Sequence, residues 1–252
     1  MNPQILETSL SLLQGISSHA EIALYRRGIA TCKHLADRAG EIFSARKAKI
    51  IQDSYPLVRK AISCNAMDIL VNRLPVGLRC RAVYASLDST LFYDIETDGL
   101  GKDPLITCIT ALFRGKLTTY VRDVNFWDFL DVWSKADVLV TFNGKRFDTP
   151  VVAKTFGISK IPAQVDLMDE AAYYGLRGGL KAIEPFIGFR RKNQNIADGK
   201  AAAECWEAYC KGDGDKLDLL KTYNQDDVLS LYSLYVYLLR RSVENTPIRL
   251  DL

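Results

Sequence analysis

The 252-residue sequence is 48% hydrophobic and 25% charged, which is typical of a soluble globular chain. This length is sufficient for one large core, or for a core with a small accessory unit. This composition excludes disordered, collagen-like and fibrous proteins. The formal net charge is only +3, but residues 1–88 hold 12 basic and 7 acidic side chains, whereas the remainder holds 21 and 23. A basic first portion therefore precedes an acid-leaning second portion.

The six cysteines are scattered, form no C-x-x-C pair, and have only His19 and His34 as possible imidazole partners. This pattern argues against a zinc site and a disulfide scaffold, and it suits a reducing compartment. No window approaches about 18 uncharged apolar residues, and the N-terminus lacks the basic flank and apolar run of a signal peptide. The sequence therefore predicts a cytoplasmic protein with no membrane partner.

Residues 1–85 are expected to form a helical unit, because apolar residues recur there at three-to-four spacing. Gly15 and Gly28 punctuate the pattern, and Thr31 is placed to cap the helix that follows. The stretch around these residues resembles one helix-hairpin-helix unit, with Ser17 where that motif usually has its second glycine. The motif implies backbone contact with nucleic-acid phosphate. A small helical packing domain without a ligand fits residues 1–85 equally well.

From residue 86 to 252 a second domain is expected, in which strands and helices alternate. Short connections favour three hairpin-linked strands, and longer ones favour right-handed crossovers to two further strands. The pattern predicts an α/β fold: a mixed sheet flanked by helices, with a long last helix from about residue 216 to 241. The predicted elements are strands STLFYDIET, PLITCITALF and KLTTYVRDV, helix VNFWDFLDVWSKA, strand DVLVTF, helix FDTPVVAKTFG and strand AQVDLM.

The first acidic cluster is the sequence Tyr-Asp-Ile-Glu-Thr at residues 93–97, on the first predicted strand. Residues two apart in a strand point to the same face, so Asp94 and Glu96 are expected to project side by side, opposite to Ile95. Two adjacent carboxylates repel each other unless a cation lies between them, which indicates metal ligation. The alternative is a solvated strand end before the loop that contains Gly99 and Gly101.

The second cluster runs from Asn143 to Asp148, between the strand DVLVTF and the next helix. Asp148 is interpretable as a helix N-terminal carboxylate followed by Pro150 in the first turn. That interpretation leaves unexplained why Asn143, Lys145 and Arg146 gather with this aspartate at the carboxyl end of a strand, where ligand sites in such sheets lie.

The third cluster is Tyr-Asn-Gln-Asp-Asp at residues 223–227, on the last long helix. Helical periodicity places Asp227 on the apolar stripe with Tyr223 and Leu231, whereas Asp226 aligns with Thr222 and other polar residues. A carboxylate on the buried stripe needs a partner. Asp227 is therefore the predicted ligand, and Asp226 is expected to be solvated.

In this order the motifs YDIET, N-x-x-x-F-D and Y-x-x-x-D resemble the three exonuclease motifs of the DEDD superfamily of 3′-to-5′ exonucleases, on an RNase H-like fold. The resemblance covers about residues 89–239. Stretches such as LKAIEPFIGFRR and YNQDDV are similar to predicted prokaryotic exonucleases with an RNase H-like domain, which also have a helix-hairpin-helix-like leader. The tyrosine of the third motif implies the tyrosine branch, since no histidine follows Asp94.

The resemblance implies two-metal hydrolysis of nucleic acid at a single-stranded 3′ end. Two Mg²⁺ or Mn²⁺ ions suit the hard oxygens of Asp94, Glu96, Asp148 and Asp227, with Asp94 shared between the ions by analogy. Tyr223, a neutral phenol at pH 7, is expected to orient the attacking water. Two alternatives remain: a non-catalytic nucleic-acid-binding module of a repair or defence assembly, and an endonuclease with the same metals.

Further residues around the predicted site have weaker interpretations. Thr97, Asn143, Lys145 and Arg146 are candidates for contact with the terminal nucleotide or its phosphates. Asp166 is interpreted as a helix cap in preference to a supporting carboxylate. The basic run at residues 190–192 is either a guide for the strand or an exposed loop. Phe126, Trp127 and Trp133 fall at helical spacing and are expected in the core.

Overall fold

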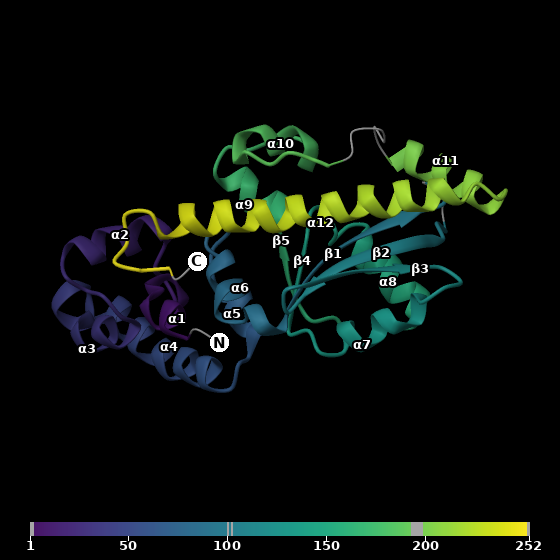
Figure 1. Cartoon of the computed structure of the whole chain (residues 1–252). Coiled ribbons are helices and arrows are strands. Elements are labelled where there is room, and N and C mark those ends of the chain that lie inside the picture. Colours follow the sequence, from purple (N-terminus) through teal and green to yellow (C-terminus); the bar gives the residue numbers. More distant parts are fainter. Residues whose placement is uncertain (1–2, 100, 102, 193–198, 251–252) are drawn as a thin grey trace. The chain divides into compact units, whose positions relative to one another are not determined.

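The computed structural model describes residues 3–99, 101, 103–192 and 199–250. The chain forms two compact units, one of residues 1–87 with 237–252 and the other of residues 88–236 (Figure 1). The final turns of the last helix thus group with the first unit, although the predicted boundary lies at residue 86. Within the described ranges, no helix has both the length and the apolar character needed to cross a membrane.

The first unit is helical, as the spacing of its apolar residues predicts. The side chains of Ser17 and Thr31 cap α2 and α3, each accepting a hydrogen bond from the backbone N–H three residues later (3.2 and 3.1 Å). Gly15 and Gly28 adopt positive φ before these caps, a region that favours glycine. The elements are α1 (Gln4–Thr8), η1 (Leu10–Leu12), α2 (Ser18–Arg26), α3 (Cys32–Ile42), α4 (Ala45–Ser63), α5 (Met67–Arg73) and α6 (Cys80–Ala85).

A buried ion pair lies inside this helical unit. Arg81 on α6 and Glu21 on α2 are each 1% exposed and form a salt bridge. The same guanidinium donates to Ser9 Oγ (3.3 Å) and to the carbonyl oxygen of Ser242, and the second oxygen of Glu21 accepts from the N–H of Ser11 (2.7 Å). Buried charges need such partners, so this network ties segments from both ends of the chain into one core.

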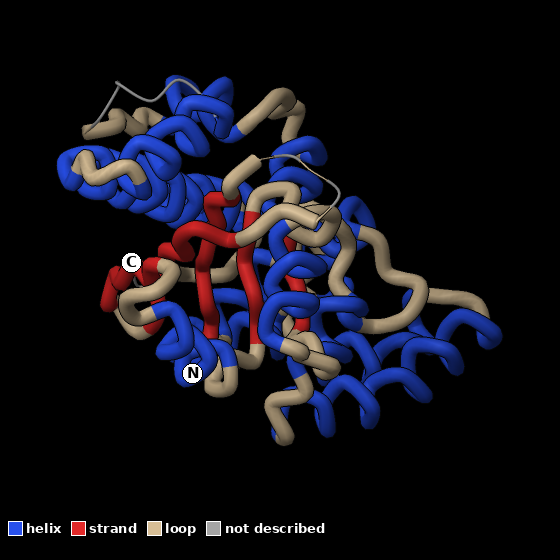
Figure 2. The backbone as a smooth tube through the Cα atoms, turned by 90° about the vertical axis from the view of Figure 1, so that its right-hand side faces the viewer, coloured by secondary structure: helices blue, strands red, loops and turns tan. Residues whose placement is uncertain are grey.

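The second unit contains one five-stranded mixed sheet in the order β3-β2-β1-β4-β5. β1 pairs antiparallel with β2, and β2 with β3, whereas β4 and β5 are parallel to β1 and to each other. This confirms the predicted α/β fold with three hairpin-linked strands and two crossover strands (Figure 2). The strands are β1 (Thr90–Thr97), β2 (Ile106–Phe113), β3 (Lys116–Val121), β4 (Val138–Thr141) and β5 (Ala163–Asp166).

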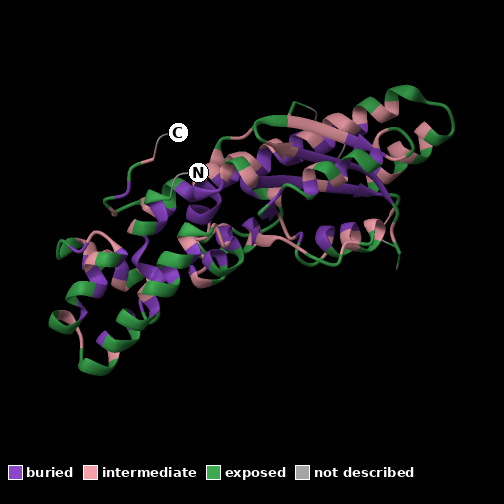
Figure 3. Cartoon of the chain, turned by 90° about the horizontal axis from the view of Figure 1, so that it is seen from below, coloured by how far each residue is buried: buried purple, intermediate pink, exposed green. Residues whose placement is uncertain are grey.

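The two faces of β1 meet different helices. Leu91, Tyr93 and Ile95 belong to one apolar cluster with residues of η3, α7 and α8. Phe92 points the other way, and its ring lies 5.3 Å from that of Tyr232 on α12. Since side chains alternate along a strand, Asp94 and Glu96 share the α12 face. β1, β2 and β4 are buried along most of their length (Figure 3).

The helices of this unit carry three residues of the motifs, Asp148, Tyr223 and Asp227. They are η2 (Leu87–Ser89), η3 (Phe126–Asp128), α7 (Phe129–Trp133), α8 (Asp148–Phe156), α9 (Leu167–Tyr173), α10 (Leu180–Ile187), α11 (Gly199–Cys210) and α12 (Gly214–Val243). Phe126 and Trp133 are buried as predicted, but Trp127 is 66% exposed, so its predicted core position is wrong. The segment begins with a 3₁₀ turn instead of an α-helix, which changes the angular spacing of these aromatics.

Candidate metal centre

Three carboxylates from β1 and α12 lie together. Asp94 and Glu96 come from the α12 face of β1, and Asp227 comes from α12, one turn after Tyr223. One oxygen atom from each carboxylate lies within 4.8 Å of the other two. Oxygens at this separation can share a hard cation such as Mg²⁺, which binds oxygen ligands at about 2.0–2.1 Å. The all-oxygen donor set therefore fits Mg²⁺ or Mn²⁺ and does not fit a thiolate-type zinc site.

Asp148 lies against the same strand, beside the three-carboxylate group. It is the first residue of α8 and is 6% exposed. Its Oδ1 accepts a hydrogen bond from the N–H of Ile95 (3.3 Å), the residue between the two strand carboxylates. A hydrogen bond between Tyr93 Oη and Thr149 Oγ1 (2.8 Å) holds the start of α8 to β1. The second motif is thereby brought to the first.

Burial and mutual repulsion dominate the electrostatics of these carboxylates. Desolvation raises the pKa of Asp148 to about 7, against hydrogen bonds from backbone N–H groups, which lower it. The pKa values of Asp94 and Glu96 are raised well above their ordinary values. Desolvation is the largest cause, and the negative charges of Asp227 and Asp148 come next. Burial also raises the pKa of Asp227, while its contact with Arg191 lowers it. Without a bound cation, this part of the fold therefore retains protons that exposed carboxylates would release.

Tyr223 lies beside the cluster and is 6% exposed. Burial, then the charges of Asp227 and Glu96, raises the pKa of its phenol above the ordinary value. The side chain is consequently neutral and retains its O–H at physiological pH, which makes it a hydrogen-bond donor in this acidic environment.

Asp166 organises the turn between β4 and α8. Its carboxylate accepts hydrogen bonds from the N–H groups of Asn143 (2.7 Å) and Lys145 (3.3 Å). It also caps α9 by accepting from the N–H of Met168 (3.1 Å), as its interpretation as a helix cap predicts. A Cβ atom on Gly144 would lie 2.4 Å from Cβ of Thr141, so this tight turn requires glycine. The turn sets the position from which Asp148 begins α8.

The side chains predicted to contact nucleic acid differ in exposure. Lys145 and Arg146 are exposed, and Asn143 is half-buried with positive φ. The Oδ1 atom of Asn143 is buried and has no hydrogen-bond partner among the described residues. Thr97 is buried, and its hydroxyl donates to the carbonyl oxygen of Gly99 (2.9 Å). Thr97 lies on β1, and the other three residues lie in the β4–α8 turn. Their contact with nucleic acid remains a prediction.

Two residues that sequence reasoning did not assign to the site contact its carboxylates directly. Asn224, fully buried, donates from Nδ2 to Oδ2 of Asp94 (2.7 Å). Arg191 donates from Nη2 to Oδ1 of Asp227 (2.6 Å) and forms a two-point pair with Glu184 of α10. Asn224 lies inside the third motif, three residues before Asp227, so its position on the inward stripe was a usable signal. Arg191 belongs to the basic run at residues 190–192, which the sequence offered either as a guide for the strand or as an exposed loop, but its contact with Asp227 was not predicted.

The prediction that Asp226 is solvated is wrong, because this side chain is 1% exposed. The middle of α12 is buried on more than one side. Its Tyr232 packs against Phe92 of β1, while Lys181 of α10 lies over the ring of Tyr223. A helix covered from two directions has no fully polar face at this level.

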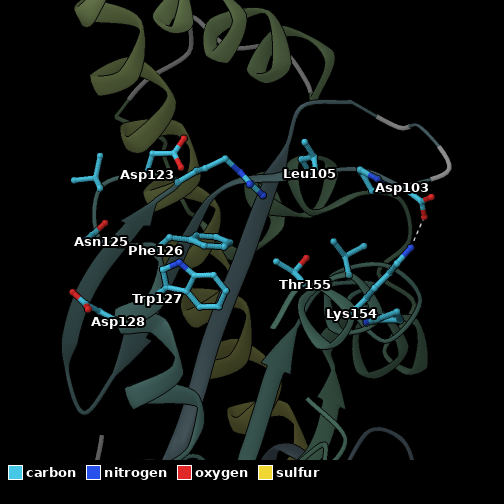
Figure 4. A pocket seen from close by; sticks show the side chains of 14 residues that line it. Asp103, Leu105, Asp123, Asn125, Phe126, Trp127, Asp128, Lys154 and Thr155 are labelled. Carbon is cyan, nitrogen blue, oxygen red and sulfur yellow. Dashed lines mark hydrogen bonds and ion pairs between the residues drawn. The ribbon is translucent and has the colours of Figure 1, made fainter. Parts of the chain in front are cut away.

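A cavity of about 850 Å³ lies elsewhere in the same unit, lined by residues 103–105 and 122–128 and by one side of α8. None of the predicted site residues lines it. Figure 4 shows the rings of Phe126 and Trp127 on one wall and Lys154, paired with Asp103, on the other. The exposed Trp127 indole packs edge-on against Phe156 (5.4 Å between centroids), which accounts for its place at the cavity rather than in the core.

The fold and the carboxylate centre together define an α/β domain of the RNase H-like class. The family model for the RNase H superfamily matches residues 91–239, which include all five residues of the three motifs. The chain therefore belongs to the RNase H superfamily. Among solved structures, the family B DNA polymerase from the hyperthermophilic archaeon Pyrobaculum calidifontis is similar at 20% identity and a TM-score of 0.49, over 60% of this chain and 24% of the polymerase. No curated protein matches the sequence.

Proposed function

We propose that this protein is a metal-dependent 3′-to-5′ exonuclease of the tyrosine branch of the DEDD superfamily, acting on single-stranded 3′ ends of DNA or RNA. One observation carries the proposal. Asp94, Glu96 and Asp227 present their oxygens within 4.8 Å, Asp148 is hydrogen-bonded to the same strand, and Tyr223 lies one helical turn before Asp227. Membership of the RNase H superfamily supports it.

Each residue has a role in this proposal. Divalent ions, when bound, supply a water of lowered pKa and neutralise charge on the attacking and leaving oxygens. Asp94, Glu96, Asp148 and Asp227 would hold these ions. Tyr223 keeps its proton and orients the attacking water through its hydroxyl. Contacts to the terminal nucleotide come from Thr97, Asn143, Lys145 and Arg146.

The direct test is incubation of 5′-labelled single-stranded DNA and RNA with the protein in Mg²⁺ or Mn²⁺. We expect a ladder that shortens from the 3′ end, and its loss in Asp94→Asn. Asp131→Asn is the matched control, because it makes the same chemical change at an exposed position of α7. Equal activity of wild type and Asp94→Asn would overturn the proposal. Cleavage of closed circular single-stranded DNA would replace exonuclease with endonuclease action.

We also propose that residues 1–85 form a domain that grips nucleic acid, and that residues 86–252 form the exonuclease domain. A cavity of about 390 Å³ lies beside the hairpin at Gly15, and Arg73 and Arg79 contribute to its lining. Gln14→Glu places a negative charge there and should weaken oligonucleotide binding by a few fold, whereas Gln4→Glu on α1 should not. Equal affinities of the two variants in fluorescence anisotropy would contradict the gripping role.

A further inference from the structure

Two cationic side chains lie next to the carboxylate cluster, on the ring of Tyr223. Nζ of Lys181, from α10, lies 4.5 Å from the ring centroid, and the guanidinium carbon of Arg191 lies 5.5 Å from it. Lys181 lies on α10, and Arg191 follows the end of this helix, ten positions further along the chain. Like charges that converge on one ring repel each other, and carboxylates offset part of this repulsion, since Arg191 pairs with Glu184 and Asp227. An anionic ligand beside the two cations would offset more of it.

The donors of Arg191 show which part of it remains for that ligand. Its side chain is 8% exposed. Nε and Nη2 pair with both oxygens of Glu184 (2.6–3.0 Å), and Nη2 also donates to Asp227 (2.6 Å). Nη1 is buried and has no hydrogen-bond partner among the described residues. A guanidinium has five N–H groups, and the two on Nη1 are thus without an acceptor, which is costly inside a protein.

The carboxylates hold Arg191 on one side only. Glu184 is 7% exposed and fixes one edge of the guanidinium in the two-point geometry that arginine forms with carboxylates. With Glu184 and the four motif carboxylates ionised, and Lys181 and Arg191 charged, the formal charge of this group is −3. Two divalent cations convert that charge to +1, which attracts a phosphate.

From these contacts we propose that Lys181 and Arg191 form a phosphate-binding site next to the metal centre, in which Nη1 of Arg191 donates to a phosphate oxygen of the substrate strand and Glu184 positions the guanidinium. The proposal rests on the proposed function for the identity of the strand, but the binding site itself is independent of hydrolysis. The recognised group is a nucleotide phosphate held beside the ions, so it is present in both the substrate and a nucleoside monophosphate product.

The test uses the full chain and two successive calorimetric titrations, first with Mn²⁺ and then with thymidine 5′-monophosphate on the Mn²⁺-loaded protein. Arg191→Gln should weaken nucleotide binding at least tenfold and leave Mn²⁺ binding within threefold of wild type or tighter, because a competing positive charge is removed. Arg190→Gln is the matched control: it removes the same charge from the adjacent, exposed position and should change neither titration by more than twofold.

Lys181→Gln, at a half-buried position on α10, provides a second variant if Arg191→Gln fails to fold, and should weaken nucleotide binding several-fold. The proposal would be overturned if Arg191→Gln or Lys181→Gln bound the nucleotide as tightly as Arg190→Gln does. It would also be overturned if Mn²⁺ binding and nucleotide binding were lost in parallel, because that result marks a purely structural role. A wild-type protein that binds the nucleotide without degrading oligonucleotides would refute the exonuclease function and leave this site standing.

Discussion

Asp148→Asn should stabilise the cation-free protein, although it removes a proposed metal ligand. The pKa of Asp148 is raised to about 7 in the folded state, against an ordinary value of about 3.9 for an unfolded chain. Below about pH 4 both states bind the proton. As the pH rises from 4 to 7, the unfolded state releases this proton before the folded state does, so the wild type loses stability. The loss reaches about 4 kcal/mol and is constant above pH 7. Asparagine is neutral throughout and can still accept the hydrogen bond from Ile95.

The assay is urea unfolding in EDTA at pH 4.5 and pH 8, followed by tryptophan fluorescence. All three tryptophans, Trp127, Trp133 and Trp206, lie in the unit of residues 88–236, so the signal reports the unit that contains Asp148. We expect Asp148→Asn to be more stable than wild type by about 2–4 kcal/mol at pH 8 and by only about 1 kcal/mol at pH 4.5. Added Mn²⁺ should stabilise the wild type more than the variant, which keeps three of the four carboxylates. Coincident curves of both proteins at pH 8 in EDTA would refute the reasoning, and Asp131→Asn should not alter the pH dependence.

Other predictions follow from individual contacts. Asn224→Ala should reduce Mn²⁺ affinity about 10- to 100-fold in calorimetry, because Asp94 loses the amide that orients it; unchanged affinity would contradict this role. Gly144→Ala should cost about 1–3 kcal/mol in fluorescence-monitored unfolding, since its Cβ meets Thr141, and a neutral effect would show that the turn relaxes. Arg81→Ala should destabilise the helical unit by about 3–5 kcal/mol in far-UV circular dichroism melts, because it leaves a buried carboxylate unpaired; a loss below 1 kcal/mol would show water reaching that pair.

The sheet and the face on which each carboxylate lies were predictable because they depend on local periodicity, whereas the convergence of the three motifs was implied by the family resemblance. The alternation of β1 places Asp94 and Glu96 on one face, and the helical stripe of α12 turns Asp227 inward, where it is 9% exposed. The hairpin linkage of the first three strands followed from their short connections. These features depend on repeats of two and about 3.6 residues, which a single sequence displays.

The features that escaped prediction depend on packing between distant segments. Asp226 is buried because α12 is covered from two sides. The periodicity of a single helix does not show how many other elements pack against it. Arg191 meets Asp227 across 36 positions of sequence, at a distance set by the path of the chain after α10. Trp127 turned outward because three residues adopted 3₁₀ geometry, whose sequence preferences overlap with those of an α-helix.

The carboxylates of the candidate centre lie at positions 94, 96, 148 and 227, and the two outermost segments are separated by more than half of the chain. Closing such a long loop carries an entropic cost that is recovered only when β1 and α12 are both in place, so the centre belongs to the slow, non-local part of folding. During synthesis, a nascent chain that has not yet reached residue 227 lacks one of the four carboxylates. A nuclease with this arrangement acquires its ligand set late, and a chain interrupted earlier would be released without it.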